Sequence, residues 1–108
     1  MIKANFYRNS NQDIIGFRVS GHAGYAKYNQ DIVCAAVSAL VTSTINSVEV
    51  HSETAYVCEQ GASGFWQFKF KEVPDEIGRV LIHTLLMALE GIRDSYGEKF
   101  LQVHYKEV

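Results

Sequence analysis

Few residues of this 108-residue chain can form covalent or metal cross-links, because it has only two cysteines and four histidines. The two cysteines are distant in sequence, and no cysteine or histidine has the close spacing that zinc sites use. A single disulfide would add little to a chain that is long enough to bury a hydrophobic core. We therefore expect two free thiols, no metal site and no other cofactor.

The chain also lacks a large net charge and a long uninterrupted hydrophobic run. A net charge of −2 and a pI near 6.0 predict no general attraction to nucleic acid or to anionic lipid. The most apolar stretch, residues 32–50, is interrupted by hydroxyl, amide and carboxylate side chains, which argues against a membrane span. The first residues alternate like a strand and show no signal segment, so we expect a cytoplasmic protein.

What the chain does have is the composition of a globular domain, with 47% hydrophobic and 20% charged residues. It shows no internal repeat, linker or low-complexity tract. One domain over residues 1–108 is the simplest organisation.

Periodicity and turn residues predict seven secondary-structure elements. Alternating residues indicate strands and apolar residues three and four apart indicate helices. Asp31 and Pro74-Asp75 are typical helix starts, and Gly97 is a typical helix end. The predicted elements are strands 2–8, 14–20, 54–60, 65–71 and 100–106, a helix from Asp31 to about His51, and a helix from Asp75 to near Gly97. This β-β-α-β-β-α-β order predicts an α+β fold, a five-stranded sheet with two helices packed on one face.

A thiol and an imidazole are the candidates for chemistry. Cys34 is the third residue of the first predicted helix, and His22 lies at the end of a predicted strand, just after Gly21. A thiol near a helix N-terminus ionises more readily than free cysteine, and an imidazole can act as its general base. The pair predicts a small thiol enzyme, although a lone helix cysteine is more often a small buried hydrophobe.

Other residues near this pair have both a structural and a functional interpretation. Asp31 is a helix cap that is also placed to orient His22. Ser38 lies one turn beyond Cys34, where its hydroxyl bonds either the reactive groups or, by default, the Cys34 carbonyl. Cys58, within a strand, is interpreted as a packed side chain.

The segment between the two reactive residues, 24–30, has no clean period and contains Tyr25 and Tyr28. We interpret it as a mobile flap whose tyrosines close over a bound substrate. Tyr25 and Tyr28, together with Gly21 beside His22, are the expected substrate-binding residues. Backbone N–H groups at the helix start are expected to stabilise the oxyanion.

The motifs Gly21-His22-Ala23 and Asp31-Ile32-Val33-Cys34-Ala35-Ala36-Val37-Ser38 resemble those of the ribosomal-processing cysteine protease family, Prp. The resemblance extends over nearly the whole chain. It implies removal of a short N-terminal extension from a large-subunit ribosomal protein, with Cys34 as nucleophile and His22 as base.

The resemblance also implies that Asp31 and Ser38 support the pair, that the protein is a homodimer, and that the peptide carries aromatic and aliphatic residues before the scissile bond. One departure is Asn29, where family members commonly have glycine. Asparagine tolerates the left-handed region best after glycine, so the turn can survive.

Two other classes remain open on the residues alone. A non-enzymatic, ribosome-associated binding module would use the aromatic strand 65–71 to dock a protein partner. A redox-sensing thiol protein would need Cys58 as a resolving cysteine.

Overall fold

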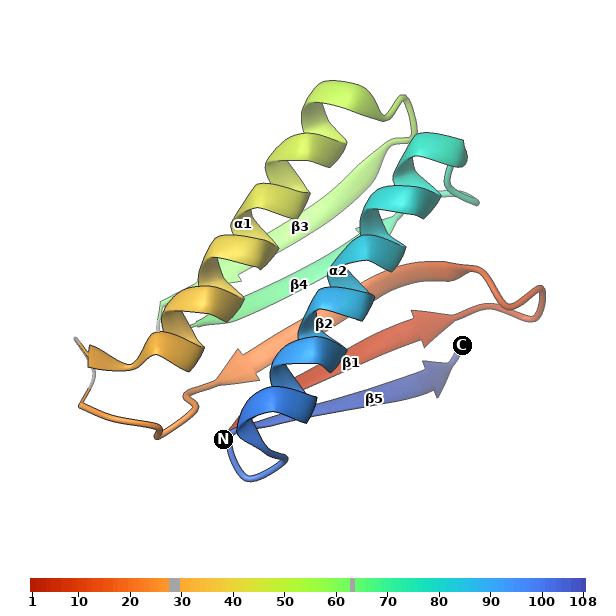
Figure 1. Cartoon of the computed structure of the whole chain (residues 1–108). Helices are drawn as coiled ribbons and strands as arrows, with labels where there is room; N and C mark the ends of the chain where they lie inside the picture. Colours follow the sequence, from red (N-terminus) through yellow and green to blue (C-terminus); the bar gives the residue numbers. More distant parts are fainter. Residues whose placement is uncertain (28–29, 63) are drawn as a thin grey trace.

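The computed structural model describes residues 1–27, 30–62 and 64–108. Within them it has the seven elements in the predicted order, so the α+β fold is confirmed (Figure 1). Every boundary lies within two residues of its prediction. The elements are β1 (Ile2–Arg8), β2 (Ile14–Gly21), α1 (Ile32–His51), β3 (Tyr56–Gly61), β4 (Phe65–Phe70), α2 (Glu76–Tyr96) and β5 (Leu101–Glu107).

The five strands form one sheet in the order β3-β4-β2-β1-β5, and both helices lie on the same face of it (Figure 1). β1 pairs in parallel with β5, whereas its pairing with β2 and the pairs that β4 makes are antiparallel. Alternate residues of the strands pack under the helices, for example Trp66, Phe68 and Phe70 of β4. The other set of side chains faces away from the helices.

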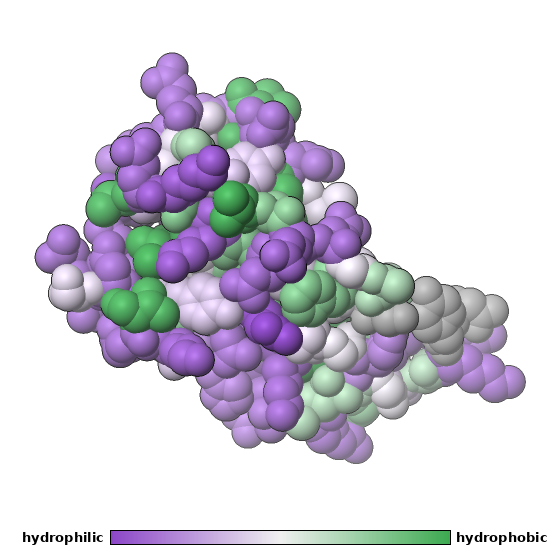
Figure 2. Space-filling model, turned by 180° about the vertical axis from the view of Figure 1, so that it is seen from behind, coloured by the Kyte–Doolittle hydropathy of each residue, from purple (hydrophilic) through white to green (hydrophobic). Residues whose placement is uncertain are grey.

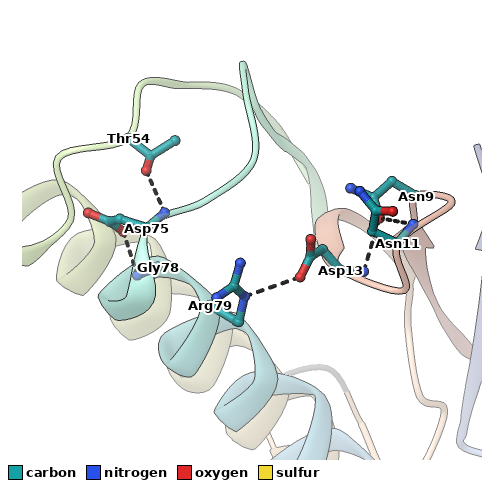
Figure 3. Close-up of polar contacts among 7 residues, drawn as sticks. All are labelled: Asn9, Asn11, Asp13, Thr54, Asp75, Gly78 and Arg79. Atoms are coloured by element: carbon teal, nitrogen blue, oxygen red, sulfur yellow. Dashed lines mark hydrogen bonds and ion pairs between the residues drawn. The ribbon is translucent and has the colours of Figure 1, made fainter.

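Asp75 fixes the start of α2 to the loop that precedes β3 (Figure 3). Its carboxylate accepts the N–H of Gly78, with an N···O distance of 2.8 Å, as a helix cap does. Its own N–H donates to Oγ1 of Thr54 at 2.8 Å. One turn into the helix, the guanidinium of Arg79 contacts Asp13 in the first hairpin at 3.1 Å. The helix that covers the sheet is therefore tied to two loops at the same end of the molecule.

The first hairpin turn relies on an asparagine side chain. Oδ1 of Asn9 accepts the N–H groups of Asn11 and Asp13 at 2.9 and 3.0 Å (Figure 3). Gln12, in the same turn, has a φ of 67°, in the left-handed region.

By length and composition alone, α1 could cross a membrane. One such helix is weak evidence, because the core helix of a soluble protein passes the same test. Here Val33, Val37, Val41 and Val48 of α1 are buried in the core beside the sheet.

Cys58 does not pack in the core, so its interpretation as a packed side chain is wrong. The residue is exposed. It lies on β3, which is an edge strand of the sheet, and residues 57–61 of that strand are all exposed. Alternation in the sequence cannot distinguish an edge strand from a central one.

Three segments that are far apart in sequence meet at one end of the molecule. They are the end of β2, the start of α1 and the turn between β3 and β4 (Figure 1). Gly64 and Gly21 allow this approach, because a Cβ on Gly64 would lie 3.1 Å from the Gly21 carbonyl oxygen and both residues have positive φ. The candidate site lies where these segments meet.

Candidate active site

A pocket of about 380 Å³ opens where β2, α1 and the β3–β4 turn come together. It brings together five of the seven predicted site residues, and its remaining lining is mainly apolar. The predicted residues in the lining are Gly21, His22, Asp31, Cys34 and Ser38.

Asp31 joins the start of α1 to the segment that precedes it. Its Oδ1 accepts the Cys34 N–H at 3.0 Å and its Oδ2 accepts the Tyr25 N–H at 3.0 Å. Burial by itself raises the pKa of Asp31, but these N–H groups outweigh it and hold the pKa below its ordinary value of 3.8. The predicted helix cap is confirmed, and each of the two carboxylate oxygens accepts a backbone N–H.

The Cys34 sulfur accepts a hydrogen bond from the backbone N–H of Ala23, with an N···S distance of 3.1 Å. Burial raises the pKa of the Cys34 thiol above 9.0, and the Asp31 carboxylate raises it further, although the Ala23 N–H opposes both. The expectation of a readily ionised thiol is therefore wrong for this conformation.

The N–H groups of Cys34 and Ala35, near the start of α1, already have acceptors. The Cys34 N–H is bound to the Asp31 side chain, and the Ala35 N–H to the Asp31 carbonyl oxygen at 3.1 Å. The N–H that lies at the sulfur belongs to Ala23, from the loop after β2. Sequence reasoning missed this donor because any residue but proline carries a backbone N–H; only its position after His22 could have pointed to it.

The expectation that Tyr25 lies over the pocket is not met in this conformation. Its ring packs edge-on against Tyr96 and Phe100, with centroid distances of 5.5 and 5.1 Å. Tyr25 is absent from the pocket lining among the described residues. Tyr25 is thus anchored to the end of α2 and to the residue before β5. Tyr28 and Asn29 lie outside the described residues.

Two side-chain donors at the pocket have no acceptor among the residues that the structure describes. The hydroxyl of Ser38, in the pocket lining, has no hydrogen bond to another described residue, so its default bond to the Cys34 carbonyl is not formed. The indole N–H of Trp66 is buried and unpartnered. Trp66 also lines the pocket, and the sequence marked it only as part of an aromatic strand.

Replacing Asp31 by asparagine should destabilise the fold. Asparagine still caps a helix, but its amide has one acceptor oxygen for two N–H donors, and a buried donor left unpaired costs about 1–3 kcal/mol. Chemical denaturation at neutral pH should show a loss of that size, with Asp94→Asn on the surface as control.

The pH dependence of unfolding has a definite sign for Asp31. Its folded pKa lies below 3.8, so its contribution to stability is complete above pH 3.8 and is lost as the pH falls through the folded value. The acid limb of stability should therefore be shallower in Asp31→Asn. An unchanged free energy and an unchanged acid limb would contradict the role given to Asp31.

A thiol and an imidazole in one pocket, with a backbone N–H directed at the sulfur, is an arrangement typical of a cysteine peptidase. Comparison with known proteins agrees with this class. The family model for cysteine protease Prp matches residues 1–101. This chain belongs to the cysteine protease Prp family.

Individual relatives agree with this membership. The ribosomal processing cysteine protease Prp of Bacillus subtilis is 34% identical over 103 residues, covering 91% of this chain and 92% of that protein. The protein of the same name from Staphylococcus aureus is 24% identical over 107 residues, covering 98% and 100%.

The fold is also that of a solved Prp structure. A crystal structure of the essential ribosomal processing protease Prp from S. aureus, in complex with a covalently linked product peptide, superimposes with a TM-score of 0.92. Its sequence is 21% identical, and the match covers 98% of this chain and 100% of that one.

Proposed function

We propose that this protein is an endopeptidase that removes a short N-terminal extension from a large-subunit ribosomal protein, with Cys34 as nucleophile and His22 as general base. One observation carries the proposal. The Cys34 sulfur lies in the same pocket as His22, with a backbone N–H 3.1 Å away. The names of the relatives support the choice of a ribosomal substrate.

The proposed reaction has two steps. His22 takes the thiol proton, and the sulfur bonds to the scissile carbonyl carbon. This carbon becomes tetrahedral, and its oxygen becomes the negatively charged oxyanion. The imidazolium then gives its proton to the leaving amine as the C–N bond breaks, leaving a thioester on Cys34. Water, deprotonated by His22, hydrolyses the thioester to release the extension as a carboxylic acid and to restore the thiol.

Ala23 is the proposed oxyanion donor. Its N–H is 3.1 Å from the sulfur, so it lies within reach of an oxygen on the carbon that the sulfur attacks. It is held in place because Ala23 is buried in the core. The same N–H thus binds the resting sulfur and then the developing charge.

The pocket lining supports an apolar residue before the scissile bond. Val19, Ile32, Val37 and Trp66 contribute apolar surface to it. The Ser38 hydroxyl and the Trp66 N–H are the donors that a bound peptide would satisfy, which would fix its register.

A direct test is incubation of the purified protein with a peptide that carries the extended N-terminus of the host ribosomal protein. We expect a single cut, detected by mass, and no cut in a peptide whose apolar residues before that bond are replaced by serine. If both the extended peptide and its serine-substituted version remain intact after prolonged incubation, the proposal is contradicted. Equal cutting of both peptides would contradict the role given to the apolar pocket.

We also propose that the protein is cytoplasmic and a homodimer. Ribosome assembly in the cytoplasm supports the location. An apolar stripe on the outer side of α2 supports the dimer: Ile77, Val80 and Met87 recur at helical spacing and are 47%, 55% and 59% exposed. The helix layer is therefore the surface that a second copy would cover.

Val80→Glu should convert the dimer to a monomer in sedimentation experiments, because it places a charge in the middle of the apolar stripe. Val57→Glu is a matched control, since Val57 is 53% exposed on an edge strand far from the stripe in the fold. A wild-type protein that sediments as a monomer at every concentration would exclude the dimer, and a dimer insensitive to Val80→Glu would exclude this surface.

A further inference from the structure

The face of the sheet that carries no helix, here called the open face, has a composition unlike that of the whole chain. Every second residue of each strand lies on the open face, as strand alternation and the pairing register require. Side-chain contacts agree with this placement. Tyr7 and Gln67 are joined across β2 at 3.3 Å, and Arg18 lies over the Phe65 ring at 5.0 Å.

Cations are concentrated on the open face. Among the strand residues on it are Lys3, Arg18, Lys69 and Lys106, and one acidic residue, Glu59, at the β3 edge. The chain has ten basic and twelve acidic residues, so six basic and eleven acidic ones lie elsewhere. The open face thus carries +3 and the remainder −5. The net charge of −2 conceals this separation.

None of these four cations takes part in an ion pair among the described residues, although Arg18 lies over the Phe65 ring. Within the described residues the ion pairs are Arg8–Glu107, Arg79–Asp13 and Arg93–Asp94, none of which includes them. Lys69 and Lys106 lie in the same row of the sheet, on strands three positions apart, and are therefore separated by about 14 Å at the usual strand spacing. The charge is distributed across the sheet rather than focused on one point.

The other side chains of the open face suit a nucleic acid. Tyr7 and Phe65 are partly exposed aromatic rings, and Gln67 and Asn5 supply amides. Unpaired cations meet phosphates, while aromatic rings on a sheet can stack on unpaired bases. Figure 2, which shows the molecule from the side without helices, shows many hydrophilic residues with hydrophobic ones among them. An acidic protein would meet the cations but would make no particular use of the rings.

We propose that the open face binds single-stranded RNA, mainly through phosphate contacts with these four cations. The proposal goes beyond the proposed function, because the peptide pocket lies on the helix side of the sheet and does not need the open face. An enzyme held on RNA by one face keeps its pocket free for a protein bound to the same RNA. This raises the local concentration of a ribosomal substrate without any change in the pocket.

Fluorescence anisotropy with a labelled single-stranded RNA of about 20 nucleotides tests the proposal. Wild-type protein should bind with a dissociation constant between about 10⁻⁶ and 10⁻⁴ M at physiological salt, and more tightly at low salt. Four phosphate contacts predict a slope of about −2.8 for the logarithm of the affinity against that of KCl concentration. Lys3→Gln with Lys69→Gln should weaken binding about tenfold and bring the slope to about −1.4.

A matched control is Arg79→Gln with Lys99→Gln, which removes the same charge from outside the open face. It should bind RNA nearly as wild type does. Absence of binding to the wild type at low salt, or an equal loss in both double variants, would overturn the proposal. Cleavage of the free peptide should be unchanged in both, so failure of RNA binding and failure of the peptidase assignment are separate results. A sedimentation change in Lys3→Gln with Lys69→Gln, without RNA binding, would assign the face to a second copy instead.

Discussion

Cys34→Ala should abolish peptide cleavage and leave the fold intact. The substitution removes the only atom that bonds to the substrate in the proposed reaction, and loss of a nucleophile costs about 10⁶ in turnover in a comparable hydrolase. The structural cost should be small, because a sulfur is a weak acceptor for the Ala23 N–H and Cys34 is only partly buried. Mass detection of the cut peptide, together with circular dichroism, measures both effects.

The chain provides a matched control for this result. Cys58→Ala removes the other thiol, which is exposed on an edge strand and is not among the described residues of the pocket lining. It should cleave at the wild-type rate. Cys34→Ser keeps an acceptor for the Ala23 N–H and should also be folded and inactive. Wild-type turnover by purified Cys34→Ala would contradict the mechanism.

His22→Gln should lower the rate of cleavage by about 10² to 10⁴ while leaving peptide binding close to wild type. Burial raises the pKa of the Cys34 thiol, and in the proposed reaction a base therefore takes the thiol proton. His22 is the imidazole that lines the pocket, and it is exposed, so its replacement should cost little stability. Separate measurement of kcat and KM distinguishes a lost base from a lost peptide contact.

His83→Gln is the control for His22→Gln, since His83 is exposed on α2 and does not line the pocket. In the His22→Gln variant, high pH should restore thiolate formation but not the proton that the imidazolium gives to the leaving amine, so the rate should recover only in part. A loss in KM alone, with kcat unchanged, would make His22 a binding residue and not a base.

The two other classes of protein make different predictions. A binding module would bind the extended peptide and leave it whole, in wild type and Cys34→Ala alike. A redox sensor needs two thiols that meet, but Cys34 lies in a pocket whose described lining excludes Cys58. Slow alkylation of Cys34 without peptide does not separate an enzyme from a binding module, because burial already keeps that thiol protonated.

Local chemistry made the elements and the cap predictable. Asp31 precedes an apolar helical pattern, so its role as N-cap follows from residue type and position, and Gly97 ends α2 for the same kind of reason. The placement of His22 and Cys34 in one region was also predictable, because a short segment joins the strand end to the helix start.

Long-range contacts were not predictable in the same way. Nothing in β1 indicates that it lies between β2 and a parallel β5, and nothing in β3 indicates that it is an edge strand. The sequence predicts Tyr25 to be a flap residue, yet its ring packs against Tyr96 and Phe100, which are more than 70 residues away in sequence. The positive charge of the open face arises only when strand register brings Lys3, Arg18 and Lys69 onto the same side of the sheet.

The most direct test of Cys34 as nucleophile is rapid acid quenching of wild-type protein mixed with the extended peptide, followed by intact-protein mass measurement. We expect a transient species heavier by the acylated N-terminal extension, with the adduct located on Cys34 after digestion. Cleavage without any adduct, or an adduct on Cys58, would contradict the account.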